Sequence, residues 1–224
     1  MGRRRGDLVH QELSSSEPDE VELRGRTRPF PGAVFDVVAM ASSAGGIAAL
    51  TEVLGNLPGD FPAAIVVVQH LDPRHRSLMA DILRRRTALD VLQASEGDPI
   101  RPGTAYIAPP DRHLLVNPNG TLSLSHSELV HFVRPSADLL FESVAASYRQ
   151  RAIAVVLTGT GSDGSMGIGA IKKMGGTVVA QDQASAEFSG MPGAAIRSGY
   201  ADFILPLDEI ASALVTLVMK EMAT

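Results

Sequence analysis

Short apolar runs that end in polar, often glycine-rich loops limit most strongly what this chain can fold into. The first run, FDVVAMA, leads into SSAGG, and the runs that open AAIVVVQH and AIAVVLTGTGSDG also end in polar residues. Such continuous apolar runs are typical of strands buried on both faces of a parallel sheet. Helical patterns lie between them, for example over residues 45–57 and 137–149. The sequence therefore predicts an α/β fold with a doubly wound, mostly parallel sheet flanked by helices.

Two further features complete the predicted fold. The segments TAYIAPPDRHLLV and GTLSLS alternate apolar and polar residues around NPNG, which predicts an antiparallel hairpin at one edge of the sheet. A closing helix is predicted over residues 208–222, with Asp208 as its N-cap.

The first 33 residues differ in composition from the rest of the chain. They are polar and charged, so we expect a disordered tail over residues 1–33 and a folded domain over 34–224. The formal net charge of −5 argues against nucleic acid as the partner, and the absence of cysteine excludes disulfides and thiolate metal sites. No apolar run is long enough to cross a bilayer. We expect a cytoplasmic protein that does not insert into the membrane.

Polar side chains follow three of the predicted strands, where ligands bind in sheets of this kind. Ser43 lies in SSAGG, His70 ends the second strand, and Asp163 lies in TGTGSDG. A hydroxyl, an imidazole and a carboxylate at one edge are the set that a catalytic triad requires: the imidazole takes the hydroxyl proton and the carboxylate orients the imidazole. The strand ends therefore indicate a serine hydrolase.

Each member of this set also has a simpler interpretation. The serines of SSAGG could cap the following helix, His70 could be structural, and an aspartate between glycines is common in turns. A glycine-rich turn could also bind phosphate, although SSAGG is neither G-x-G-x-x-G nor a Walker A loop. Between the two hydroxyls, Ser43 has a small residue at each flank of a nucleophile-elbow frame, whereas a frame centred on Ser42 begins at Met40. Ser42 is then a supporting or capping residue.

Several motifs in order resemble the catalytic domain of the chemotaxis methylesterases of the CheB type. They are ASSAGG, VVVQHLDP, GTAYIAPPDRHLLV, VRPSADLLFESVA, VVLTGTGSDGSMG and VVAQDQASAEFSGMPGAAIRSG, and the resemblance covers residues 35–218. The resemblance implies a metal-free, cofactor-free protein-glutamate methylesterase that releases methanol from glutamate γ-methyl esters on chemoreceptor helices. It also implies deamidation of certain receptor glutamines. The family's serine, histidine and aspartate fall on Ser43, His70 and Asp163.

The resemblance implies supporting roles as well. The backbone N–H groups of Ala44 and Thr160 would form an oxyanion hole, although the family commonly carries threonine and methionine there. Arg134, in VRPSAD, would engage a carboxylate-rich substrate helix; the alternative is a solvated loop arginine. The phosphorylated receiver domain of the family has no counterpart in the short tail. Three explanations stay open: activity without phosphorylation control, control by a separate protein, or a sequence that is a fragment of a longer polypeptide. The acidic residues within the tail segment EPDEVE, residues 17–22, could instead mimic the substrate.

Three other functions fit parts of the pattern. The same triad could serve an esterase or amidase with another substrate. A protein with an impaired triad could dock receptor helices without catalysis. A phosphate-binding protein could use the two glycine-rich loops.

Overall fold

A seven-stranded sheet in which every neighbouring pair is parallel forms the centre of the molecule. The computed structural model describes residues 30, 33–70 and 77–219. In spatial order the strands are β3 (Asp90–Gln93), β4 (Thr104–Ile107), β2 (Ala64–Gln69), β1 (Val37–Ser42), β7 (Ala152–Val156), β8 (Thr177–Gln181) and β9 (Phe203–Leu205). The predicted fold class is confirmed.

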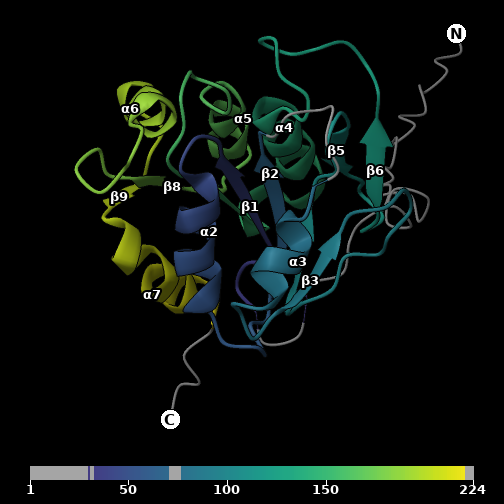
Figure 1. Ribbon diagram of the computed structural model, residues 1–224. Helices are drawn as coiled ribbons and strands as arrows, with labels where there is room; N and C mark the ends of the chain where they lie inside the picture. The colour runs from purple at the N-terminus through teal and green to yellow at the C-terminus, as the bar shows by residue number, and fades with distance from the viewer. Residues whose placement is uncertain (1–29, 31–32, 71–76, 220–224) are drawn as a thin grey trace, which may run out of the picture.

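Helices cover both faces of this sheet (Figure 1). One face packs against α2 (Gly46–Gly55), α3 (Met79–Arg84) and α7 (Leu207–Val218), and the other against α4 (Ala137–Tyr148), α5 (Gly167–Lys173) and α6 (Gly190–Arg197). A short 3₁₀ turn, η1 (Arg149–Arg151), joins α4 to β7.

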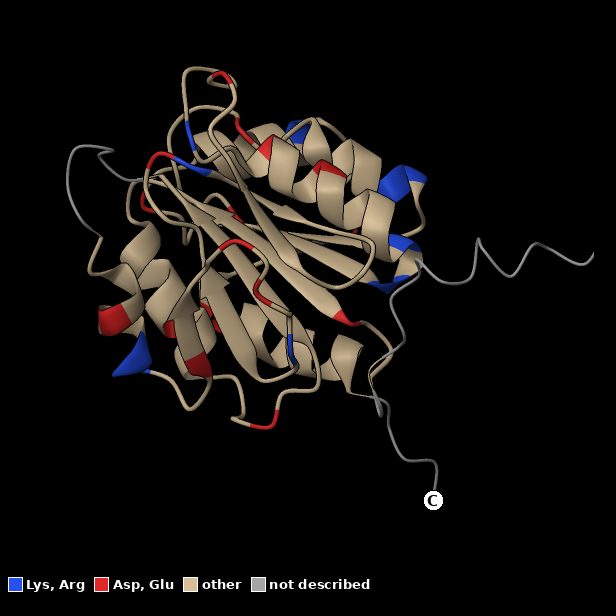
Figure 2. Ribbon diagram, turned by 90° about the vertical axis from the view of Figure 1, so that its right-hand side faces the viewer, with Lys and Arg blue, Asp and Glu red and all other residues tan. Residues whose placement is uncertain are grey.

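Alternating side chains of each strand build two separate apolar cores. In β1, Val37, Ala39 and Ala41 enter the core under α4, whereas Val38 and Met40 enter the core under α2. Both faces are buried, which is why these strands are continuous apolar runs in the sequence. Figure 2 shows the charged residues mostly on helices and loops, with almost none in the middle of the sheet.

The predicted hairpin is present, but it is arranged differently from the prediction. Strands β5 (His113–Val116) and β6 (Leu122–Ser125) form a separate two-stranded antiparallel sheet beside α4 instead of extending the large sheet. The TAYI segment that we assigned to the hairpin is β4, a buried inner strand of the parallel sheet. Pro109 and Pro110 separate it from β5, because proline cannot donate to a strand ladder.

The closing helix, α7, begins earlier than predicted. The closing helix has Pro206 as its N-cap, and Asp208 lies inside the first turn, where a negative charge favours the helix dipole. The helix is described only to Val218, and residues 220–222 of the prediction lie outside the described residues. Most of the predicted tail lies outside them too. None of the described helices has both the length and the apolar character that crossing a bilayer requires.

Strand β1 lies at the point where the strand order reverses. Strands from the first half of the chain lie on its β2 side, and those from the second half lie on its β7 side. The connections after β1 and β7 therefore diverge to opposite faces and leave a crevice at their carboxyl ends, which is where α/β proteins bind ligands. The residues that we singled out follow β1, β2 and β7.

Candidate active site

The two serines after β1 have different environments. Ser42 is buried, and its hydroxyl donates a hydrogen bond of 2.7 Å to the Gln69 side chain. Ser43 is half-buried, and within the described part of the chain its hydroxyl makes no hydrogen bond. The N-cap of α2 is Gly45, which adopts a left-handed φ of 74°, and no side chain caps the helix. The capping interpretation is therefore wrong for both serines, and the supporting role of Ser42 agrees with its contact.

Strand pairing places Ser43 next to His70. Ser42 and Gln69 are register partners in β1 and β2, and the His70 N–H donates to the Ser42 carbonyl at 3.2 Å. The residues that follow, Ser43 and His70, therefore leave the sheet side by side at its carboxyl edge.

Gln69 connects these two strand ends, a role that the sequence analysis missed. Its amide nitrogen donates to the carbonyl of Ser43 at 2.7 Å and to that of His70 at 3.0 Å, while its oxygen accepts from Ser42. A β-carbon at position 46 would lie 2.0 Å from the Gln69 oxygen and 2.8 Å from the Ser42 β-carbon, so any residue larger than glycine would force these groups to move. A buried glutamine at the end of an apolar strand was the available signal, because such a group needs hydrogen-bond partners.

Asp163 reaches His70 from the loop after β7. Its Oδ2 lies 2.9 Å from Nε2 of His70. The carboxylate also accepts hydrogen bonds from the Ser136 hydroxyl and from the backbone N–H groups of Ala137 and Asp138, at 2.9, 2.6 and 3.2 Å. Burial would raise the pKa of Asp163, but the hydrogen bonds from His70 and the backbone outweigh burial and lower that pKa below its usual value. Asp163 is therefore held ionised beside the imidazole.

Asp138 holds the same loop from the opposite direction. Its Oδ1 accepts hydrogen bonds from the N–H groups of Met166 and Gly167, at 3.0 and 2.7 Å, at the start of α5. Asp163 thus caps α4, and Asp138, which belongs to α4, caps α5. Burial raises the pKa of Asp138, and the neighbouring charge of Asp163 adds to that effect. The two carboxylates lock the loop that carries Asp163 onto α4.

A third titratable group lies beside this pair. His131 Nδ1 is 3.4 Å from Asp138 Oδ2, a buried oxygen without a hydrogen-bond partner, and His131, Asp138 and Asp163 offer ligand atoms within 4.8 Å of one another. Both oxygens of Asp163 already accept two hydrogen bonds each. We therefore assign no metal to this cluster.

Ala44 and Thr160, the predicted oxyanion residues, lie on facing loops. The Thr158 hydroxyl donates to the Ala44 carbonyl at 3.1 Å, which ties the loop after β7 to the loop after β1. Among the described residues, the N–H groups of Ala44 and Thr160 donate no hydrogen bond. At Gly159 an added β-carbon would lie 2.8 Å from the Ser43 β-carbon, so the two loops approach closely only because this residue is glycine.

Arg134 has its hydrogen-bonding groups engaged within the chain. Its guanidinium donates twice to Oδ1 of Asp111, at 2.9 and 2.6 Å, and once to the Ser127 carbonyl at 2.6 Å. With 14% of its side chain exposed, it is not the solvated loop arginine of the alternative interpretation. Its predicted contact with substrate stays a prediction.

The other histidines lie elsewhere. His113 is buried in β5, where its ring nitrogens contact the Glu128 carbonyl and the Ser136 N–H. His126 is exposed and pairs with Asp111. His75 lies outside the described residues.

Comparison with known proteins identifies the family. Residues 38–214 match the family described as CheB methylesterase. The chain belongs to the CheB methylesterase family. A protein-glutamate methylesterase/protein-glutamine glutaminase of Moorella thermoacetica is 45% identical over 188 residues, which is 82% of this chain and 44% of that protein. A second protein of that name, from Methanosarcina mazei, is 40% identical over 95% of this chain and 58% of its own length. The chain thus spans about half the length of these relatives.

A solved structure agrees with the CheB assignment. The crystal structure of the Thermotoga maritima CheB methylesterase catalytic domain superposes with a TM-score of 0.79 at 40% sequence identity. The match covers 82% of this chain and 99% of that domain.

Proposed function

We propose that this chain hydrolyses the γ-methyl esters of glutamate side chains on chemoreceptor-like proteins and releases methanol. The observation that carries the proposal is the contact of 2.9 Å between His70 and Asp163 beside Ser43, at the strand ends where an α/β fold binds ligands. Membership of the CheB methylesterase family supports the reaction type, and the names of the relatives support the substrate class.

In the proposed mechanism Ser43 is the nucleophile and His70 the base. Asp163 engages Nε2 of His70, which leaves Nδ1 to take the proton as Ser43 Oγ attacks the ester carbonyl carbon. His70 then returns that proton to the departing methoxide, and methanol leaves. A water molecule, deprotonated by His70, attacks the acyl-enzyme. Ser43 recovers its proton, and the glutamate carboxylate is released.

The oxyanion of each tetrahedral intermediate needs hydrogen-bond donors. We assign this role to the N–H groups of Ala44 and Thr160, which have no acceptor among the described residues and lie on the two loops that flank Ser43. Such donors stabilise the transition state because they already point at the position where negative charge develops.

The same groups support a second substrate, the glutamine side chain. Attack by Ser43 on the amide gives the same acyl-enzyme, with ammonia in place of methanol as the leaving group. The glutaminase in the names of both relatives favours this activity.

One experiment distinguishes the proposed function from the alternative functions. A chemoreceptor cytoplasmic domain carrying tritiated methyl esters is incubated with the wild-type chain, Ser43→Ala and Ser42→Ala, and the released methanol is counted. We expect release by the wild type, none above background with Ser43→Ala, and retained release with Ser42→Ala. The last variant leaves the buried Gln69 oxygen without its hydrogen bond from Ser42, at a cost of about 1–3 kcal/mol in stability. Methanol release by Ser43→Ala at the wild-type rate would refute the nucleophile. Hydrolysis of p-nitrophenyl acetate without methanol release would indicate an esterase with another substrate.

A further inference from the structure

The segment that joins β6 to α4 presents apolar side chains to solvent. Phe132 is 94% exposed and Leu129 is 53% exposed. Phe132 has the largest exposed fraction of any large apolar residue described in the structure. Isolated exposed apolar residues are common, so exposure alone does not indicate a function. The backbone and the surroundings of Phe132 give further evidence.

The backbone around Phe132 is held in an unfavourable conformation. His131 and Phe132 have φ values of 49° and 66°, in the left-handed region that residues with side chains seldom adopt. The turn is closed by a reciprocal pair of backbone hydrogen bonds between Val130 and Val133, at 3.2 and 2.9 Å. The folded chain thus stabilises a conformation that leaves the phenyl ring almost fully exposed among the described residues. Strain of this kind often marks a functional segment.

Side-chain contacts hold the turn on both sides. Before Phe132, His131 contacts the buried Asp138 at 3.4 Å. After it, Arg134 makes two hydrogen bonds to Asp111 and one to the Ser127 carbonyl. The Arg134 hydrogen bonds are the main reason that the pKa of Asp111 lies below its usual value. The residues before and after Phe132 are therefore both held against the rest of the domain, and this fixes the position of the turn.

The turn adjoins the candidate active site. His131 contacts Asp138, whose backbone N–H donates to Asp163, the partner of His70. In Figure 1 the β6–α4 segment runs over the edge of the sheet at which β1 and β2 end. A protein bound with one side chain at Ser43 would extend along this edge.

We propose that Phe132 is a contact residue for the helical protein that carries the ester, an inference that rests on the proposed function. A methyl ester is too small to provide selective binding, so the binding energy must come from surfaces away from the reacting bond. A helix beside the ester offers aliphatic side chains and the stems of long polar ones to an aromatic ring. Arg134 is already paired with Asp111, so this turn suits an apolar contact better than recognition of a carboxylate.

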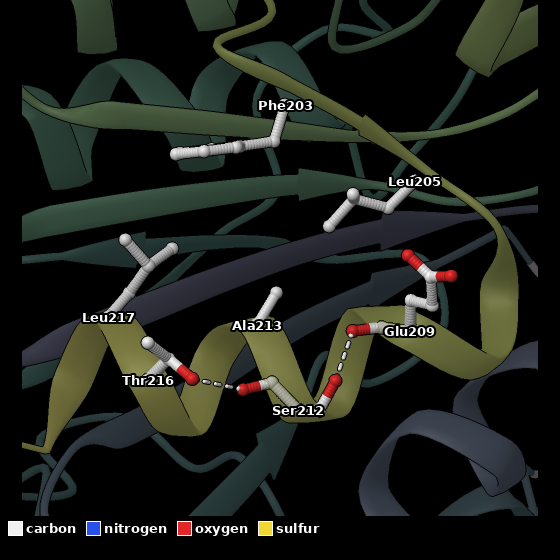
Figure 3. Close-up of a pocket in the computed structure, with 7 residues that line it drawn as sticks. All are labelled: Phe203, Leu205, Glu209, Ser212, Ala213, Thr216 and Leu217. Atoms are coloured by element: carbon white, nitrogen blue, oxygen red, sulfur yellow. Dashed lines mark hydrogen bonds between the residues drawn. The ribbon is translucent and has the colours of Figure 1, made fainter.

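The test compares two substrates and two phenylalanines. Phe132→Ala keeps the β-carbon, and with it the backbone conformation, but removes the ring. Phe203→Ala is the matched control, because Phe203 is 41% exposed at the amino end of β9, the opposite edge of the sheet. It lines a shallow pocket against α7 with Leu205 and Leu217 (Figure 3). Each variant is assayed with methylated chemoreceptor cytoplasmic domain and with p-nitrophenyl acetate.

We expect Phe132→Ala to raise KM for the receptor domain roughly tenfold, with kcat little changed and with wild-type kinetics on p-nitrophenyl acetate. Phe132→Tyr should restore most of the lost affinity, and Phe203→Ala should match the wild type on both substrates. An unchanged KM for Phe132→Ala, or an equal loss on both substrates, would overturn the inference but leave the proposed function intact. A wild-type chain that releases no methanol from the receptor domain would overturn both.

Discussion

At the scale of single residues, the site depends on which nitrogen of His70 is engaged. Nε2 faces Asp163, so in the proposed mechanism it is Nδ1 that exchanges a proton with Ser43. Asp163 fixes the ring by a hydrogen bond, and in the proposed mechanism it would also stabilise the imidazolium that forms. Gln69 holds the backbone carbonyls of both Ser43 and His70, which keeps the two side chains in register.

Replacing His70 should remove catalysis and leave the fold. We expect His70→Gln to lower kcat on p-nitrophenyl acetate by at least about a thousandfold, because the serine hydroxyl loses its base. His126→Gln is the matched control: His126 also pairs with an aspartate, Asp111, but it is exposed and outside the proposed triad. It should keep wild-type kinetics on this small ester. Turnover by His70→Gln close to that of the wild type would refute the assignment.

At the scale of helices and loops, two carboxylates cap the amino ends of two neighbouring helices. Asp163 accepts from the first residues of α4, and Asp138 on α4 accepts from the first residues of α5. The negative charge of Asp163 at the start of α4 also interacts favourably with the helix dipole. This capping fixes the loop between β7 and α5, and the two pKa shifts run in opposite directions.

The opposite shifts predict opposite effects of pH on stability. The pKa of Asp163 is lower in the folded protein than in the unfolded chain, so ionised Asp163 stabilises the fold above the ordinary aspartate pKa, and this is lost as pH falls through the folded pKa. The pKa of Asp138 is raised, so its contribution is present at low pH and is lost as pH rises through the folded pKa.

Urea unfolding of two variants measures this difference. We expect the stability deficit of Asp163→Asn relative to the wild type to be larger at about pH 7.5 than at about pH 4.5. Asp138→Asn keeps an oxygen for the N–H groups of Met166 and Gly167 and removes a desolvated charge. The free energy of unfolding of Asp138→Asn, relative to that of the wild type, should therefore rise from about pH 4.5 to about pH 7.5. The same pH trend in both variants would contradict the assigned shifts.

At the scale of the whole molecule, the buried strands could be predicted because burial on both faces leaves a continuous apolar run. The carboxyl ends of such strands meet at one edge, so Ser43, His70 and Asp163 could be grouped from the sequence. The position of β4 could not be predicted, because its apolar alternation also fits a hairpin strand. Only its pairing with β2 and β3 distinguishes an inner strand of the parallel sheet from a hairpin strand.

Contacts between residues far apart in the chain also could not be predicted from the sequence. Asp138 lies 28 and 29 residues from the N–H groups that it accepts from, and Asp111 lies 23 residues from Arg134. No local pattern relates such positions. The motif that suggested Arg134 for substrate therefore could not indicate that its guanidinium is already bound.

The described residues that lead into β1 contact the domain at a distance from the candidate site. Phe30 donates to Asp36 at the start of β1, and Val34 donates to the carbonyl of Val218 at the end of α7. Both contacts lie at the amino edge of the sheet, opposite Ser43. We expect deletion of residues 1–28 to change turnover on p-nitrophenyl acetate by less than roughly tenfold, about 1.4 kcal/mol of barrier.

Assays of the full and truncated chains at low and high salt check this prediction. If the acidic residues within the segment 17–22 mimic the substrate, truncation should instead activate the protein strongly, and salt should activate the full chain by screening those charges. A large, salt-sensitive activation on truncation would contradict our expectation.

In the proposed mechanism Ser43 is a nucleophile activated by His70 and Asp163. Labelling with a fluorophosphonate probe, followed by mass spectrometry of the proteolytic peptides, tests this assignment most directly, because only an activated hydroxyl reacts with this phosphorus centre. We predict one labelled residue, Ser43, in the wild type and in Ser42→Ala, and no label in Ser43→Ala or His70→Gln. A label on any other residue of the wild type, or undiminished labelling of Ser43→Ala, would contradict it.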